Sequence, residues 1–259
     1  MLFELYQHLR TPCPRPVKEM GYLKELIGMA ARGQRCRKAW APHLQHCRDW
    51  IVQAMGDCPI RGKVVVLGSG LLNDVPIDEL SQGFERVRLV DILHLPVVKK
   101  ALKAYENVEL VEQDISGLVE PLYRHIKNGV PLEIPAKANI PAEDADLVIS
   151  LNVLSQLPII PGIFAGKNNR PLGEDIAQTL IDSHLKALEG LPSRVCLITE
   201  VEQRLCQGGD VLETLNPLLD VEIPNSLKTR FESWEWHFAP HPERHPEHDL
   251  IYQVEAYRH

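Results

Sequence analysis

The sequence predicts an α/β fold: a doubly wound, mostly parallel sheet with a C-terminal antiparallel hairpin and an N-terminal helical extension. Strand and helix patterns alternate from Lys63 onward, which is typical of successive βαβ units. Near the C-terminus this alternation gives way to two runs in which every second residue is apolar. With 259 residues, 44% of them hydrophobic, the chain is long enough to bury the core of one such domain with an appendage.

Five short apolar runs are the predicted parallel strands. The first, Lys63–Leu67, is rich in valine, which is the pattern of a strand buried on both faces. The other strands are expected at 86–91, 107–112, 145–150 and 194–200. Helices are expected near 75–82, 95–105, 116–127, 174–190 and 204–219, and a proline-containing connection covers 128–144.

The N-terminal part reads as two amphipathic helices. Residues 18–31 place apolar side chains on one face, and Gly33 is expected to end this helix. Pro42 suits the first turn of the next helix. We therefore predict a helical lid or extension at 1–58 and the main domain at 59–259.

The C-terminal hairpin is predicted from 230–238 and 249–257, which both alternate apolar and polar residues. The connection between them is rich in proline and histidine. The spacing of the histidines would suit metal ligands on a helix face. Because prolines disfavour a helix there, we expect a solvated loop and no metal site. These histidines are His237, His241, His245 and His248.

Small and acidic residues follow the first two strands, where a ligand crevice is expected. Gly68-Ser69-Gly70 follows the first strand, and two glycines allow a tight turn and a close approach by a ligand. Asp91 closes the second strand. In an open α/β sheet, an acid at that strand end can bind two ribose hydroxyls. The combination predicts a cofactor that contains a nucleoside.

These features, over residues 60–259, resemble the class I S-adenosylmethionine (SAM)-dependent methyltransferases. The resemblance implies that SAM is the cofactor and that a methyl group passes to a small-molecule acceptor by in-line displacement. It implies that the Gly68-Ser69-Gly70 loop wraps the methionine part of SAM, that Asp91 binds the ribose and that Asp114 approaches the adenine. The implied cofactor site comprises Gly68, Ser69, Gly70, Asp91, Ile92, Asp114, Ile115 and Asn152, the last after the fourth strand.

No catalytic residue is assigned, because the cofactor supplies an activated methyl group and the protein supplies orientation. Asn152, Glu200 and Glu202 are the candidates for a base near the crevice. The chain departs from the family pattern in two places. Val66 stands where the family often has an acid, and Leu72 stands at the third glycine position.

Each implied site residue has a structural alternative. Asp91 and Asp114 could each cap the helix that follows. Asn152 could satisfy backbone groups of its loop. Asp74, just beyond the glycine turn, could face the ligand or cap the helix that starts near Pro76.

Two other functions fit part of the pattern. A nicotinamide-dependent oxidoreductase would also use Gly68, Gly70 and Asp91. Against it, the third glycine of the dinucleotide fingerprint falls at Asn73, and the sequence has no Tyr-x-x-x-Lys pair. The other alternative is a non-catalytic binding protein with the methyltransferase fold, which the departures at Val66 and Leu72 favour.

Charge and composition bound the partners. Residues 1–62 carry a net charge of +5 on a chain of net charge −7, so the remainder carries −12. The basic cluster Arg32, Arg35, Arg37 and Lys38 points to an anionic acceptor, and a solvated helix face is the alternative. An acidic chain is not expected to bind nucleic acid.

No apolar run approaches the length of a membrane span. The six cysteines form no CxxC pair and are expected to be reduced thiols, so a cytoplasmic protein is expected. The oligomeric state is not predicted.

Overall fold

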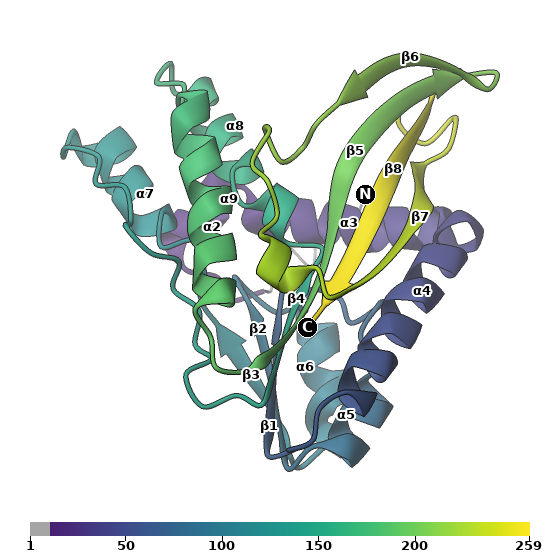
Figure 1. The fold of residues 1–259 in the computed structure, drawn as a ribbon. Helices are drawn as coiled ribbons and strands as arrows, with labels where there is room; N and C mark the ends of the chain where they lie inside the picture. The colour runs from purple at the N-terminus through teal and green to yellow at the C-terminus, as the bar shows by residue number, and fades with distance from the viewer. Residues whose placement is uncertain (1–10) are drawn as a thin grey trace.

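The computed structural model describes residues 11–259 as a mixed sheet flanked by helices (Figure 1). Its strand order is β3-β2-β1-β4-β5-β8-β7, and β6 pairs with β5 outside this path. Strands β1 to β5 are parallel to one another, while β8 runs antiparallel to both β5 and β7. The predicted fold class is therefore confirmed. The strands are β1 Lys63–Leu67, β2 Arg86–Asp91, β3 Val108–Glu112, β4 Leu147–Leu151, β5 Arg194–Gln207, β6 Asp210–Leu215, β7 Arg230–Ala239 and β8 Asp249–Arg258.

Helices cover both faces of the sheet. Val64 and Val66 of β1 belong to the core between the sheet and helices α4, α5 and α6. Val65 and Leu67 belong to the core on the other face of the sheet, against α7 and α9. All five residues of β1 are buried, as its sequence predicts. The helices are α2 Arg15–Met20, α3 Tyr22–Arg35, α4 Arg37–Gly56, α5 Ile77–Gly83, α6 Pro96–Ala101, α7 Val119–Asn128, α8 Ile159–Lys167 and α9 Glu174–Glu189, with 3₁₀ turns at Leu102–Ala104, Leu154–Gln156 and Asn225–Leu227.

The helix predicted at 204–219 is wrong. The chain instead continues β5 to Gln207 and returns as β6, forming a hairpin that projects from the body (Figure 1). Gly208 and Gly209 make this turn with φ of 59° and 96°, a conformation that suits a tight hairpin. The two glycines favour a hairpin turn here, although the spacing of the apolar residues in 204–219 also fits a helix.

The N-terminal helices also differ from their predicted bounds. Gly21, at φ 108°, separates α2 from α3. Gly33 lies inside α3, and a Cβ there would lie 3.1 Å from the Trp40 ring, so this glycine allows close packing and does not end the helix. Pro42 lies inside α4, beyond its first turn. The predicted residues 1–10 of the lid lie outside the described residues.

Helix α4 is packed tightly on the C-terminal hairpin. The indole Nε1 of Trp40 donates to the carbonyl oxygen of Phe238 at 2.8 Å, and the two rings stack at 5.7 Å. Trp40 also meets the edge of Trp236, with ring centroids 5.2 Å apart. Trp236 and Phe238 of β7 are therefore buried against α4.

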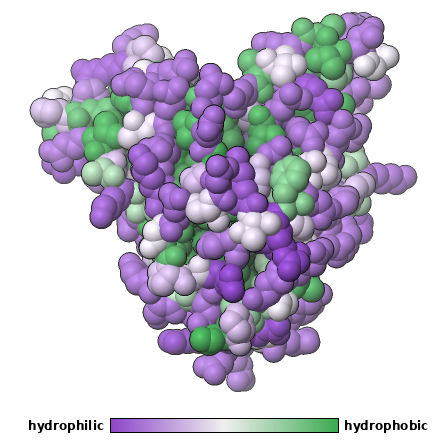
Figure 2. Space-filling model, viewed as in Figure 1, coloured by the Kyte–Doolittle hydropathy of each residue, from purple (hydrophilic) through white to green (hydrophobic). Residues whose placement is uncertain are grey.

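The surface seen in Figure 2 is mostly hydrophilic, with apolar side chains gathered in its upper half around a notch between the helices and the β5–β6 hairpin. Val211, Leu212 and Leu215 of β6 are among the exposed apolar residues. Within the described residues, no helix combines the length and the apolar character needed to cross a membrane.

Two buried histidines make the fold acid-sensitive. His184 lies 2.9 Å from Ser150 Oγ, and His94 lies 3.0 Å from Ser69 Oγ; both rings are fully buried. Burial lowers the pKa of each to about 4. Below pH 6.5 the unfolded chain gains protons that the folded chain does not. The free energy of unfolding should therefore fall by about 1.4 kcal/mol per histidine per pH unit between pH 6.5 and about 4.

Urea unfolding of the wild type and of His184→Gln at pH 7, 6 and 5 measures this effect. In the variant, the slope of the free energy of unfolding against pH should be smaller by the contribution of one proton. The difference between the two proteins isolates His184, because the buried carboxyls, which act in the opposite direction, are the same in both. Equal slopes for the two proteins would contradict the expectation.

Candidate functional site

The glycine turn follows β1, which has β2 on one side and β4 on the other. The strand order reverses between β1 and β4. Such a switch point is the usual ligand crevice of an open α/β sheet. Gly68 has φ 80°, and a Cβ there would lie 2.7 Å from the Leu151 carbonyl oxygen and 2.8 Å from Val153 Cβ. Gly70 has φ 47°, but its nearest neighbour would lie at 3.9 Å. Glycine is thus required at 68 by both conformation and space, and at 70 by conformation.

Asp91 fixes this turn from the end of β2. Its Oδ2 accepts the N–H of Gly70 at 2.7 Å, and its Oδ1 accepts the N–H of Ile92 at 2.7 Å. Helix α6 begins without a side-chain cap, so the alternative capping role of Asp91 does not apply. Burial raises the pKa of Asp91 to about 6. The structure therefore places Asp91 beside the glycine turn.

Ser69 is fully buried and faces a histidine that the sequence analysis did not single out. Its Oγ lies 3.0 Å from the ring Nε2 of His94, and the backbone N–H of His94 donates to Glu112 Oε1 at 3.0 Å. His94 follows the second strand by three residues, which is the signal that could have marked it. Ser69 therefore connects the turn to the segment after β2.

Asp114 caps the start of α7. Oδ1 accepts the N–H of Ser116 at 2.9 Å and its hydroxyl at 2.6 Å, and Oδ2 accepts the N–H of Val119 at 2.8 Å. The structural alternative named for Asp114 is therefore present. The adjacent Ile115 is buried in the core. A role of these residues with the adenine stays a prediction.

The departures from the family pattern have structural explanations. Leu72 has φ 63°, so the position where the family has glycine keeps a left-handed backbone that leucine adopts at a cost of about 1 kcal/mol or more. Val66 is fully buried in β1. The turn thus keeps its glycine-like geometry without the glycine.

Asn152 and Asp74 meet on the other side of the turn. Asn152 has φ 48°, and its Nδ2 donates to Asp74 Oδ2 at 2.9 Å. Its Oδ1 is buried and has no hydrogen-bond partner among the described residues. Helix α5 begins at Ile77, with Pro76 at its N-cap and no side-chain cap, so Asp74 does not cap it. The side chains of Asn152 and Asp74 therefore bond to each other and not only to their own loops.

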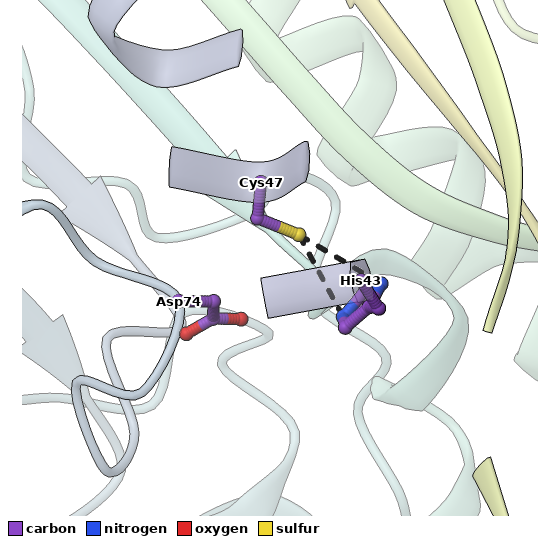
Figure 3. A group of neighbouring side chains, drawn as sticks. All are labelled: His43, Cys47 and Asp74. Atoms are coloured by element: carbon purple, nitrogen blue, oxygen red, sulfur yellow. Dashed lines mark hydrogen bonds between the residues drawn. The ribbon is translucent and has the colours of Figure 1, made fainter. Parts of the chain in front are cut away.

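Two residues of α4 complete this group (Figure 3). His43 is buried, and its Nε2 lies 3.6 Å from Cys47 Sγ; Asp74 lies across from them. One donor atom from each of these three side chains lies within 4.8 Å of the others, as a metal centre would require. The sequence analysis considered neither Cys47 nor His43 as a site residue.

The hydrogen bonding of His43 argues against a metal. Trp234 Nε1 lies 3.0 Å from His43 Nδ1, and because an indole N–H only donates, Nδ1 must be the acceptor. Burial lowers the pKa of His43 to about 3, so the ring is neutral and its proton is on Nε2. A protonated Nε2 cannot ligate an ion. We therefore interpret the group as a hydrogen-bonded network.

Glu200 reaches the same region from β5. It is 2% exposed and accepts the hydroxyl of Ser155 in a short hydrogen bond. Burial raises the pKa of Glu200, and the charge of Asp74 acts in the same direction. Burial also raises the pKa of Asp74. Glu202, by contrast, forms an ion pair with Arg204 at 3.1 Å on the strand.

The N-terminal helices reach the crevice. Burial raises the pKa of Tyr22 at the start of α3, and the nearby charges of Asp114 and Asp91 add to the rise. Arg48 of α4 donates to the Asn73 carbonyl oxygen at 2.5 Å. These contacts place α3 and α4 beside the strand ends that carry the predicted site.

Several basic and histidine side chains form ion pairs or hydrogen bonds with carboxylates. Arg35 of the basic cluster forms an ion pair with Glu243 at 2.6 Å, and Arg32 approaches the same carboxylate at 3.5 Å. In the hairpin connection, His241 Nδ1 lies 2.9 Å from Asp249 Oδ1. Glu243 thus ties the hairpin connection to α3.

Two clefts lie away from the residues of the predicted site. A cleft of about 370 Å³ is lined by Ile60, Asp146 and Arg194 among others, and one of about 230 Å³ lies along Arg86–Arg88 and 106–109. Both are at the amino ends of the parallel strands. They are therefore separate from the carboxyl ends of the strands, where the predicted site lies.

No model of a protein family and no curated protein matches the chain. Solved structures match at low identity. The N-methyltransferase NodS from Bradyrhizobium japonicum WM9 has 12% identity and a TM-score of 0.44, covering 84% of this chain and 97% of that chain. The Burkholderia thailandensis 1,6-didemethyltoxoflavin-N1-methyltransferase, with bound 1,6-didemethyltoxoflavin and S-adenosylhomocysteine, has 16% identity and a TM-score of 0.43, covering 95% and 91%. The DhpI–SAM–HEP complex has 14% identity and a TM-score of 0.43, covering 91% and 95%.

These similarities are too distant to carry an argument, and the strand order defines the class of protein. Strands β3-β2-β1-β4-β5 have the order of a doubly wound Rossmann-like sheet. The strand next to β5 is the antiparallel β8, so the closing hairpin is part of the sheet. The chain has the fold that its sequence resemblance to the class I SAM-dependent methyltransferases implied.

Proposed function

We propose that the chain is a SAM-dependent methyltransferase that moves a methyl group to a small-molecule acceptor by in-line displacement. The observation that carries the proposal is the bond from Gly70 N–H to Asp91, which joins the glycine turn to the acid of the next strand at the switch point. In this proposal the turn holds the methionine part of SAM. Asp91 and Ile92 hold the ribose, Asp114 and Ile115 border the adenine, and Asn152 lies near the methyl group.

The sheet supports this function over a nicotinamide-dependent oxidoreductase. In the dinucleotide-binding fold the sheet continues past the fifth strand with a sixth strand of the second mononucleotide half. Here the antiparallel β8 occupies that position. The group of His43, Asp74 and Glu200 favours an enzyme over a non-catalytic binding protein, because shifted pKa values of grouped ionisable residues are typical of functional sites.

Calorimetry with SAM, S-adenosylhomocysteine and NAD tests the function. We expect both sulfur nucleosides to bind and NAD not to bind. Binding of NAD alone would favour the oxidoreductase. Binding of SAM without methyl transfer to any acceptor would favour the non-catalytic protein. The anionic-acceptor hypothesis depends on Arg37 and Lys38, because Glu243 engages Arg32 and Arg35.

We also propose that the N-terminal extension, predicted at 1–58, covers the crevice of the main domain at 59–259. Helix α3 supports this role, because Tyr22 lies near Asp91 and Asp114. Helix α4 belongs to the buried core of one sheet face. The six free cysteines support a reducing location such as the cytoplasm.

Removing the Tyr22 ring tests the covering role. Tyr22→Ala should raise the Kd for SAM about fivefold to tenfold, since an aromatic contact contributes about 0.5–1.5 kcal/mol beyond its buried area. Tyr105→Ala is the control, because Tyr105 precedes β3 at the amino end of the sheet. Isothermal titration measures both variants. An unchanged Kd for Tyr22→Ala would separate α3 from cofactor binding.

A further inference from the structure

The side of the glycine turn that faces β4 and β5 is rich in hydrogen-bond acceptors. Asp74 and Glu200 bring two carboxylates, and Asn152 brings a side-chain oxygen. Asn152 is 8% exposed, and its Oδ1 is buried without a hydrogen-bond partner in the part of the chain that the structure describes. A buried acceptor without a donor costs about 1–3 kcal/mol, so this atom points to a donor that arrives from outside the chain.

The partners of the two carboxylates within the chain are neutral. Asp74 accepts from the amide of Asn152 at 2.9 Å, and Glu200 accepts from the hydroxyl of Ser155. Arg48 lies close enough to influence Asp74, but its guanidinium donates to the Asn73 carbonyl oxygen. Among residues 11–259, no cationic side chain is therefore bonded to either carboxylate.

We propose that the methyl acceptor presents an amine nitrogen, bound as its ammonium form by Asp74 and by Oδ1 of Asn152 in the field of Glu200. The proposal rests on the methyltransferase function proposed above and names its substrate class. Asp74 is only partly buried, so it is the member of the group nearest to an entry path. An ammonium brings up to three donors and a positive charge, which matches three acceptor groups that carry two negative charges.

The proposed role of Asp74 includes a proton. An ammonium has no free lone pair, so one proton must pass from nitrogen to the Asp74 carboxylate before transfer. The nitrogen lone pair then forms the new N–C bond, while the electrons of the broken C–S bond remain on the sulfur. The methylated nitrogen is left positive, and the proton on Asp74 is released to solvent. Atoms and charge balance without a further reactant.

Other acceptor atoms fit this group less well. A carboxylate or phosphate oxygen would be repelled by Asp74 and Glu200. A neutral hydroxyl brings a single donor and no charge, so it would leave acceptors of the group unpaired. The Nε2–H of His43 is a donor of the chain beside this group. Nε2 lies 3.4 Å from Nδ2 of Asn152 and 3.6 Å from Cys47 Sγ, and it does not bond to Oδ1 of Asn152.

Three probes of the same shape test the inference: benzylamine, benzyl alcohol and benzoate, titrated by ligand-observed NMR into protein saturated with S-adenosylhomocysteine. We expect benzylamine to bind and the other two not to bind. Asp74→Asn should weaken benzylamine at least about tenfold, because a hydrogen bond to a charged group is lost. Glu79→Gln, an exposed carboxylate five residues further on, is the matched control and should change nothing.

Glu200→Gln is the second variant, since it keeps an oxygen for Ser155 and removes only the charge. It should weaken benzylamine less than Asp74→Asn does. No binding of benzylamine, equal binding of benzyl alcohol or benzoate, or full affinity in Asp74→Asn would each overturn the inference. If S-adenosylhomocysteine itself does not bind, the methyltransferase function fails instead, which keeps the two failures apart.

Discussion

Gly68→Ala should destabilise the fold by on the order of 3 kcal/mol and abolish cofactor binding. Two costs add. A left-handed backbone costs alanine about 1–2 kcal/mol, and overpacking costs about 1–3 kcal/mol. The overpacking arises because the new Cβ would lie 2.7 Å from the Leu151 carbonyl oxygen and 2.8 Å from Val153 Cβ. Both neighbours belong to the end of β4 or the loop after it. Thermal unfolding should show a midpoint lowered by about 10 °C.

Gly129→Ala is the matched control for this prediction. Gly129 also has a left-handed backbone, at φ 70°, but a Cβ there would meet nothing within 4 Å. It should therefore lose only the conformational part, about 1 kcal/mol, and bind SAM as the wild type does. Equal destabilisation by the two substitutions would show that the β4 contact contributes nothing.

Asp91→Ala should raise the Kd for SAM at least about 100-fold. The carboxylate accepts the N–H groups of Gly70 and Ile92, so its loss removes both the proposed ribose ligand and the fixed turn. Hydrogen bonds to a charged group are worth about 1.5–3 kcal/mol each, and two of them account for this loss. Isothermal titration measures it, with the exposed Glu106→Ala as control.

The affinity of the wild type should also depend on pH. Because burial raises the pKa of Asp91 to about 6, the carboxylate is charged above pH 6 and accepts ribose hydroxyls best there. The Kd for SAM should therefore increase as the pH falls through 6. Asp91→Asn should show a flat profile over the same range. A wild-type Kd that stays constant between pH 7.5 and 5.5 would remove the charge of Asp91 from recognition.

Local patterns in the sequence were enough to predict the parallel sheet and its glycine turn. A valine-rich run such as Lys63–Leu67 is typical of a doubly buried strand, and two glycines after it favour a tight turn. Asp91 was predictable because strand ends of a parallel sheet share one edge, whatever the helices between them do. The C-terminal hairpin followed from side-chain alternation. At 204–219 the same reasoning failed, because a short apolar spacing fits a helix as well as a strand.

Sequence analysis named Asp74 and Glu200 as separate candidates, but only the tertiary structure brings them together with His43. His43 comes from α4, Asp74 from the loop after the turn, and Glu200 from β5, and no spacing in the sequence relates them. Their proximity depends on where α4 packs, which the contact of Trp40 with Phe238 across 198 residues settles. Sequence periodicity shows which face of a helix is buried, but not the partner against which it is buried. The position of Asp91 beside the glycine turn was therefore predictable from local sequence, whereas the meeting of His43, Asp74 and Glu200 was not.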